Sequence, residues 1–387
     1  MPIRFQKCLV ASIVGLGFFV ESIQAAVPLP ASSYSGLVIF GDSISDTGNV
    51  LSLTIASQST ANPQPTFPNF LAAPGRFSNG PVWTEYLAAD LGFASSASPS
   101  NLLFNGASVI PIGAQGGQNF AYGGARTGLG GSAGATTGLL GQLVAWDHSA
   151  SILGGGALTR AANPDTLYVV MAGANDLRDI RSASPTASDA QARAGAAAGI
   201  AQNITNALGL LANAGARHFL ISSLPDLGLT PEAVGLGLVG ASREVTLSFN
   251  SALAVKAASF DAGFNLLHGI DLDIRTIDFY GLVNRVADDA THNNGAIYGI
   301  TNITAPCINV GPSSGQYFFA DASATARNVA AFSDDLHPSG ASHTLLGALA
   351  AQTALAAAVP EPTEVAMLIA GLLLIGSRLR RRASTAA

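Results

Sequence analysis

Three short and almost continuously apolar runs constrain the fold of this chain more than any other feature. They occupy residues 37–40, 167–171 and 218–221, and each ends at glycine, alanine or serine. A strand with one solvated face alternates apolar and polar residues, whereas a strand of a parallel sheet is buried on both faces and is apolar along its length. The runs therefore predict strands of a parallel sheet that is covered on both sides.

Stretches with helical character separate these runs. Helices are expected at residues 81–91, 187–214, 242–260 and 341–358. The first of them has Pro81 at its start and Gly92 just after its end, which is the usual placement of these two residue types. Alternating strands and helices predict an α/β fold, here a three-layer α/β/α doubly wound domain with a mostly parallel sheet. Residues 52–74 and 94–117 are expected to be loops that line a cleft.

The N-terminal residues have the pattern of a secretory signal peptide. Two basic residues, Arg4 and Lys7, precede an apolar run at residues 8–20 that leads into small residues. A buried helix is the alternative, but it would need neither a basic start nor a small-residue exit. We therefore expect residues 1–26 to direct export and residues 27–358 to form the folded domain.

Residues 359–387 form a tail with three parts. A Val-Pro-Glu-Pro motif precedes an apolar run at residues 365–376, and the arginines that follow are Arg378, Arg380, Arg381 and Arg382. The run is shorter than the roughly 17–25 residues of a usual membrane span, and the arginines would stay on the cytoplasmic side. The tail resembles the PEP-CTERM sorting signal of Gram-negative bacteria. This resemblance implies a transient inner-membrane anchor that an exosortase processes, and delivery to the cell surface or the extracellular space. An ordinary membrane anchor is the alternative.

Charge and cysteine content exclude several classes of function. The chain has a formal net charge of −6, and the two tails hold more basic than acidic residues, so the body between them is more acidic still. Nucleic-acid binding needs a basic surface, so we do not expect it. Cys8 lies in the expected signal peptide, which leaves Cys307 alone in the body. We therefore expect no internal disulfide, and no cluster of cysteine or histidine suggests a metal site.

Two of the predicted strands are followed by residues that suit a reaction centre. Gly41-Asp42-Ser43 follows the first strand, and Gly173-Ala174-Asn175-Asp176 follows the second. In open α/β sheets ligands bind at the carboxyl ends of the strands. Ser43 is therefore placed as a nucleophile, and the amide of Asn175 could point at a developing oxyanion. Both segments could instead be plain turns, which favour the same residue types.

Two further blocks could supply the remaining groups of an acyl-transfer site. Gly123 and Gly124 lie in a glycine-rich segment, where a backbone N–H can approach a ligand closely, although a plain loop is the alternative. Asp334 and His337 lie on one short loop. A serine nucleophile needs a histidine base and a carboxylate that orients it, although a solvated acidic turn is again the alternative. Asp335 adjoins Asp334 and competes with it for the carboxylate role.

One motif points to a different class of protein. Residues 235–240 match the Gly-x-Gly-x-x-Gly spacing of dinucleotide-binding loops. That motif requires a preceding strand, and here a Thr-Pro pair and a short polar stretch stand in its place. We therefore do not expect a nucleotide cofactor.

The four blocks in this order resemble the GDSL, or SGNH, hydrolase family. Further segments similar to that family lie at residues 75–83, 224–228, 298–302 and 304–307. The resemblance implies a flavodoxin-like domain and hydrolysis of carboxylic esters without a cofactor or metal. It makes Ser43 the nucleophile, His337 the base and Asp334 its partner. It also makes the N–H groups of Ser43 and Gly124 and the amide of Asn175 the oxyanion donors, with Gly123 as an alternative to Gly124.

These features together predict an exported serine esterase or lipase that works through an acyl-Ser43 intermediate. The expected partners are an ester substrate, either a lipid or an acylated small molecule or polysaccharide, and the sorting machinery that reads the tail. One alternative is an exopolysaccharide deacetylase. Another is a cell-surface or matrix protein that keeps the fold but has lost the chemistry. Ile44 stands where the family carries its name-giving leucine, a substitution we expect to be harmless.

Overall fold

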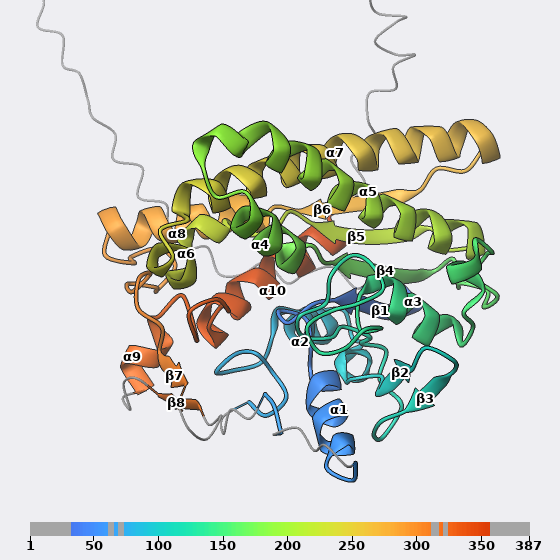
Figure 1. Ribbon diagram of the computed structural model, residues 1–387, viewed down its shortest axis with the longest axis horizontal. Helices are drawn as coiled ribbons and strands as arrows, with labels where there is room; N and C mark the ends of the chain where they lie inside the picture. Colours follow the sequence, from blue (N-terminus) through green and yellow to red (C-terminus); the bar gives the residue numbers. More distant parts are fainter. Residues whose placement is uncertain (1–31, 61–65, 69–72, 311–316, 320–323, 357–387) are drawn as a thin grey trace, which may run out of the picture.

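The computed structural model describes residues 32–60, 66–68, 73–310, 317–319 and 324–356 (Figure 1). The expected signal peptide, residues 1–26, and the expected sorting tail, residues 359–387, both lie outside the described residues. Within the described ranges, no helix is at once long enough and apolar enough to span a membrane.

The central sheet has four parallel strands in the order β1 (Gly36–Gly41), β4 (Thr166–Met171), β5 (His218–Ser222) and β6 (Asp273–Ile277). The first three are the predicted apolar runs, and all six residues of β4 are buried. The fourth strand was not predicted. Charged or polar residues are interspersed with isoleucines along this strand, and most of its residues are only half-buried, because the strand lies at the edge of the sheet.

Other segments pair with both edges of β1, as a doubly wound fold requires: β4 on one edge and the segment around Asn119 on the other. On the side of β1 away from β4, the N–H of Ile39 donates to the carbonyl of Gln118 (2.9 Å), and the N–H of Phe120 donates to the carbonyl of Ile39 (2.7 Å). Asn119 thus makes a parallel bridge to β1 outside any named strand. The predicted α/β fold is confirmed, and its switch point lies beside β1, where such folds bind ligands.

Helices cover both faces of the sheet, which gives three layers (Figure 1). On one face α5 (Ala190–Ala214) and α7 (Val239–His268) lie side by side. On the other face lie α2 (Trp83–Asp90), α3 (Leu139–Asp147) and α10 (Gly340–Leu355). Large apolar side chains from both layers, among them Phe249, Trp83 and Trp146, are fully buried against the sheet.

Several helix boundaries differ from the predicted ones. The helix expected at residues 242–260 runs from Val239 to His268 and ends where Gly269 adopts the left-handed conformation, with φ +67°. Residues 187–189 form a 3₁₀ turn, so α5 begins only at Ala190. The helices expected at 81–91 and 341–358 are slightly shorter and shifted, as α2 and α10.

The segments expected to be loops contain short elements. The helix α1 (Asn49–Ser57) enters the first of them, and the second holds a 3₁₀ turn, η1 (Ala94–Ala97), and an antiparallel hairpin, β2 (Leu102–Phe104) with β3 (Val109–Pro111). Elements this short carry too little periodicity to be read from sequence. The remaining helices, turns and strands are η2 (Ser151–Gly154), α4 (Ala174–Ala183), η3 (Ala187–Asp189), η4 (Leu227–Leu229), α6 (Pro231–Gly235), α8 (Phe279–His292), β7 (Ile308–Val310), β8 (Tyr317–Phe319) and α9 (Ala324–Asn328).

A buried glutamine fixes the end of β1. Oε1 of Gln142, on α3, accepts a hydrogen bond from the N–H of Gly41 (2.9 Å), and its Nε2 donates to the carbonyl of the same residue (2.7 Å). Buried backbone groups without partners are costly. Gln142 therefore holds in place the peptide from which the Asp42-Ser43 turn departs.

Candidate active site

Ser43 lies just past the carboxyl end of β1, as the sequence predicts. The carboxylate of Asp42 accepts a hydrogen bond from the N–H of Ile44 (3.2 Å), and the carbonyl of Asp42 accepts from the N–H groups of Ser45 and Asp46 (both 3.0 Å). These bonds fold the chain into a tight turn. Ser43 sits on the turn and is 7% exposed.

The structure brings His337 and Asp334 to Ser43 across 294 positions of the sequence. Nε2 of His337 lies 2.8 Å from Oγ of Ser43, and Nδ1 lies 2.8 Å from Oδ2 of Asp334. The backbone N–H groups of His337 and Leu336 donate to Oδ1 of the same carboxylate (2.6 and 2.9 Å). The loop therefore holds the carboxylate rigidly against the imidazole.

The environment of Asp334 keeps it ionised. Burial by itself would raise the pKa of Asp334, but the nearby His337 and the hydrogen bonds from its ring and from the two backbone N–H groups outweigh burial, and the pKa is lowered. An ionised carboxylate at Nδ1 places the ring proton there, so Nε2 is left to accept the hydroxyl proton of Ser43.

Asp335, the alternative carboxylate, faces a different part of the molecule. Its side chain is exposed, and its carbonyl accepts a hydrogen bond from the N–H of Glu232 (2.8 Å). Asp334 is the one of the two that contacts His337.

A segment at residues 77–79 contacts the histidine loop, residues 334–338, and the start of the helix that follows it. The hydroxyl of Ser78 donates to the carbonyl of Pro338 (3.1 Å), and the N–H of Gly340 donates to Oδ1 of Asn79 (2.7 Å). The ring of Phe77 lies 5.2 Å from the ring of His337. This segment supports the imidazole. Its contacts join residues that lie far apart in the sequence, so motif spacing could not have predicted them.

A buried carboxylate, Asp46, decides which glycine of the pair has a free donor. Asp46 accepts hydrogen bonds from the N–H groups of Gly48 and Asn49 (both 2.8 Å), Val50 (3.2 Å) and Gly123 (2.9 Å). The N–H of Gly123 is thus engaged. In the described part of the chain, the N–H of Gly124 has no hydrogen-bond partner, and φ of Gly124 is +75°.

Two partners at opposite ends of its amide fix the orientation of Asn175. Its Nδ2 donates to the carbonyl of Ala125 (3.0 Å), and its Oδ1 accepts from NH1 of Arg178 (3.3 Å). If the amide were flipped, Oδ1 would face the carbonyl oxygen of Ala125 and Nδ2 would face the guanidinium of Arg178, and neither pair could form a hydrogen bond. These two partners therefore settle which amide atom is oxygen and which is nitrogen. One N–H of the amide remains for a ligand. Arg178 was not singled out from the sequence, although its i+3 spacing from Asn175 on a helix was a usable signal.

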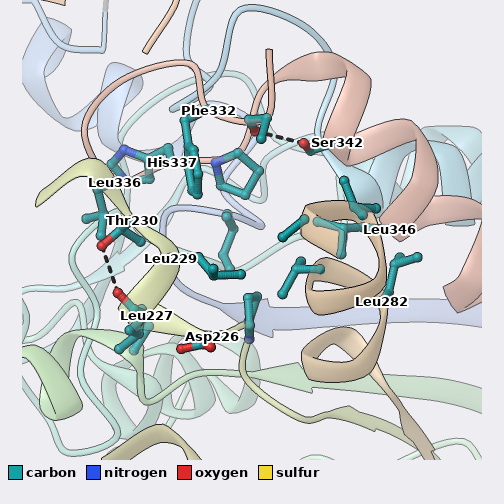
Figure 2. A pocket seen from close by; sticks show the side chains of 18 of the residues that line it. Asp226, Leu227, Leu229, Thr230, Leu282, Phe332, Leu336, His337, Ser342 and Leu346 are labelled. Carbon is teal, nitrogen blue, oxygen red and sulfur yellow. Dashed lines mark hydrogen bonds between the residues drawn. The ribbon is translucent and has the colours of Figure 1, made fainter. Parts of the chain in front are cut away.

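Two cavities meet at Ser43 and His337. One is open and also includes Gly124 and Asn175 in its wall, so the three expected oxyanion donors border one space. The other is lined mainly by aliphatic side chains from α8, α10 and the segment around Leu227 (Figure 2). The described residues hold no cluster of three or more His, Cys, Asp or Glu side chains arranged for a metal ion.

Comparison with known proteins agrees with this geometry. A family model described as GDSL-like Lipase/Acylhydrolase matches residues 37–350. The chain is 27% identical over 245 residues to the phosphatidylcholine-sterol acyltransferase of Aeromonas hydrophila, covering 62% of this chain and 58% of that protein. It is 29% identical over 256 residues to the esterase EstA of Pseudomonas aeruginosa, covering 64% of this chain and 36% of that protein. A GDSL esterase/lipase of Arabidopsis thaliana is 27% identical over 358 residues, covering 88% and 91%. The match thus spans less than two thirds of the two bacterial relatives.

The carboxyl group of Asp42, next to Ser43, is buried with one of its oxygens unpaired. Its Oδ2 has no hydrogen-bond partner among the described residues, and the side chain is 1% exposed. Burial raises the pKa of Asp42 from 3.8 to about 7, against the lowering effects of the Ile44 N–H and of His337, while Asp176 adds to the rise. Ionised Asp42 is therefore unfavourable in the folded protein.

This burial predicts how stability depends on pH. Since the folded-state pKa is raised, the cost of ionising Asp42 is fully present above pH 7 and disappears as the pH falls towards 4. Asp42→Asn removes that cost. Relative to the natural protein, the variant should therefore gain about 2–3 kcal/mol more at pH 8 than at pH 5. Denaturant unfolding at the two pH values measures this difference. Asp335→Asn, at an exposed carboxylate, is the control, and an equal effect of Asp42→Asn at both pH values would contradict the prediction.

Proposed function

The chain belongs to the GDSL-like lipase/acylhydrolase family, and on this premise we propose that it is a serine esterase that hydrolyses carboxylic esters through an acyl-Ser43 intermediate. The observation that carries the proposal is the continuous hydrogen-bonded series from Oγ of Ser43 through the His337 ring to Asp334, with distances of 2.8 Å on both sides of the ring.

Acylation begins with proton transfer within this series. As Oγ of Ser43 attacks the carbonyl carbon of the ester, its proton moves to Nε2 of His337. The carboxylate of Asp334 stabilises the imidazolium that forms. His337 then gives the proton to the leaving alcohol oxygen, the ester C–O bond breaks, and the acyl group remains on Ser43.

The attack converts the carbonyl oxygen into an oxyanion, which needs donors that already point at it. The candidates are the N–H of Ser43, the N–H of Gly124 and the unused N–H of the Asn175 amide. None of the three has an acceptor among the described residues, and all three border the open cavity. Donors fixed before the reaction avoid the cost of reorganising solvent.

Deacylation repeats these steps with water. His337 takes a proton from the incoming water, which attacks the acyl carbon, and then returns a proton to Oγ of Ser43 as the acid leaves. An alcohol in place of water would give acyl transfer, the reaction named for the Aeromonas relative. An exopolysaccharide deacetylase or an inactive surface protein is less favoured, because the reacting groups are in contact and one cavity is strongly apolar.

We also propose that the protein is exported and sorted through its tail. The proposal is supported by the basic and apolar pattern of residues 1–26 and by the motif, apolar run and arginine cluster of residues 359–387. The partners would be an exosortase-type enzyme and, transiently, the inner membrane.

The first prediction from this proposal tests the nucleophile. Ser43→Ala should lower turnover of a p-nitrophenyl ester on the order of 10⁶-fold, because it removes the hydroxyl that contacts His337 and forms the acyl-enzyme. Steady-state kinetics at equal concentrations of folded protein measure the effect. Ser132→Ala, at another serine of the open cavity, is the matched control. Activity of Ser43→Ala within tenfold of the natural protein would refute the proposed function.

The second prediction separates the two neighbouring carboxylates. Asp334→Asn should lower turnover by about 10⁴, because an amide at this position favours the wrong imidazole tautomer. Asp335→Asn should leave turnover close to that of the natural protein, since the Asp335 side chain is exposed and its backbone carbonyl bonds Glu232 rather than His337. The same ester assay decides between them, and a reversed order of the two effects would assign the role to Asp335.

The third prediction concerns the tail. In a host that has an exosortase, the mature protein should lack everything after about Pro362, because the motif and the arginine cluster mark the tail for processing. Intact-mass measurement of the protein isolated from the cell envelope and the medium gives the C-terminus directly. A mature species that keeps Arg378 to Arg382 would instead indicate an ordinary anchor.

A further inference from the structure

We propose that the apolar cavity beside Ser43 holds the acyl chain of the ester, so that the substrates are esters of linear alkyl acids much longer than acetate. This inference rests on the proposed function. It assigns the substrate class and the two sides of the ester, neither of which follows from the reacting groups alone.

The wall of the apolar cavity is built for a hydrocarbon chain. One face of α8 contributes Leu282 and Val286, and α10 contributes Leu345 and Leu346. Leu227 closes the cavity from the segment between β5 and α6. Each methylene that moves from water into such a wall strengthens binding by about fourfold. A short acetyl group would leave this surface unused.

The order of the chemical steps assigns the acyl group to this cavity. The alcohol leaves after acylation, and water must then reach the acyl carbon while the acyl group is still attached to Ser43. The group that stays therefore suits the apolar cavity, and the group that leaves suits the open one. The wall of the open cavity includes the polar residues Thr54 and Ser132, which do not line the apolar cavity, and alcohol and water can exchange through it.

Leu282 and Leu346 are placed to limit the length of the chain. Figure 2 shows His337 at one side of the cavity and these two leucines at the opposite side, on different helices. Both are buried, with exposures of 7% and 1%. A larger side chain at either position would shorten the space that begins at Ser43.

The experiment measures kcat/KM for p-nitrophenyl esters from acetate to dodecanoate with the whole protein. The natural protein should prefer octanoate or longer chains to acetate. Leu346→Trp and Leu282→Trp should each lower the ratio of octanoate to acetate activity at least tenfold. A ratio does not depend on the fraction of folded protein, so partial loss of folding by overpacking does not affect it. Leu53→Trp, in the open cavity, is the control and should leave the ratio unchanged.

The possible outcomes separate this inference from the proposed function. A ratio that both tryptophan variants leave unchanged would overturn the acyl-cavity assignment, even if Ser43→Ala is inactive. A natural protein that cleaves only acetate would overturn it as well. If no ester is cleaved, or Ser43→Ala stays active, the proposed function itself fails. If Leu53→Trp alone lowers the ratio, the acyl chain lies in the open cavity and the assignment is reversed.

A second and independent observation concerns Arg178. NH1 of Arg178 donates to Oδ1 of Asn175 (3.3 Å), and Nε donates to Oε2 of Glu232 (3.0 Å). NH2 of Arg178 also contacts Glu232, as does the buried guanidinium of Arg181. The N–H of Glu232 donates to the carbonyl of Asp335, beside the histidine loop. We infer that Arg178 is a positioning residue that acts through the Asn175 amide.

The geometry gives Arg178 two effects on that amide. Its guanidinium holds the oxygen of Asn175, which keeps the amide nitrogen turned towards Ala125 and the open cavity. A positive charge at the oxygen also withdraws electron density from the nitrogen, so the remaining N–H becomes a stronger donor. Both effects matter most when the oxyanion forms, so they should appear in kcat rather than in KM.

A double-mutant cycle tests this role. Asn175→Ala should lower kcat by about 10²–10³, and Arg178→Met by about ten- to a hundredfold, as for loss of a hydrogen bond to a charged group. In the Asn175→Ala background, Arg178→Met should have almost no further effect. Arg178→Lys should restore part of kcat. Arg181→Met is the control, because Arg181 shares Glu232 but does not contact Asn175.

Additive effects of Arg178→Met and Asn175→Ala would overturn the positioning role, since Arg178 would then act independently of the amide. A change confined to KM would do the same and would indicate direct contact with the substrate. If the control variant lowers kcat as much as Arg178→Met does, the cluster is structural and the inference is wrong.

Discussion

The parallel alignment of the sheet is the constraint on which the remaining structure depends. Parallel strands end at a common edge, so the turns after β1 and β4 must lie next to each other. This places Ser43 and Asn175 close together, although 132 positions of sequence separate their numbers. The switch point beside β1 leaves a crevice at the same edge. The histidine loop, which immediately precedes α10, reaches the same edge, and the hydrogen bond between Ser43 and His337 joins the two ends of the domain.

Such an edge lowers the stability of the fold, because it buries backbone polar groups that have no hydrogen-bond partner within a strand or helix. Side chains satisfy several of these groups. Gln142 pairs with both backbone groups of Gly41, Asp46 accepts four backbone N–H groups, and Asn119 donates to the carbonyl of Ser45 (2.7 Å). The same hydrogen bonds that make the turn possible also fix its geometry, and preorganised catalysis requires groups that are fixed before the reaction. Stability and reactivity are therefore not separate features of this edge.

Sequence reasoning succeeded where the physics is local and failed where it is not. Apolar runs identified β1, β4 and β5, because strands buried on both faces have a distinct composition. The strand β6 was missed, since Asp273 and Arg275 belong to an edge strand and pair with each other there. The residues of the candidate site were located by motif. Sequence could not choose between Gly123 and Gly124, because the choice depends on Asp46, 77 positions away. Motifs thus name the residues, whereas tertiary contacts decide which atom of each is available.

The segment that carries Glu232 joins parts of the site that sequence presents as unrelated. It contributes Leu227 to the wall of the apolar cavity, donates a backbone N–H to Asp335 beside the histidine loop, and binds the Arg178 that holds the Asn175 amide. A movement of this segment would therefore change the acyl cavity, the base and an oxyanion donor together. Coupling of this kind requires a connection between the segment and the reacting groups, and Arg178 provides it, because its guanidinium bonds both Glu232 and Asn175. An ester that fills the apolar cavity contacts the same segment that holds the reacting groups, so binding of the acyl chain and alignment of the site are physically linked.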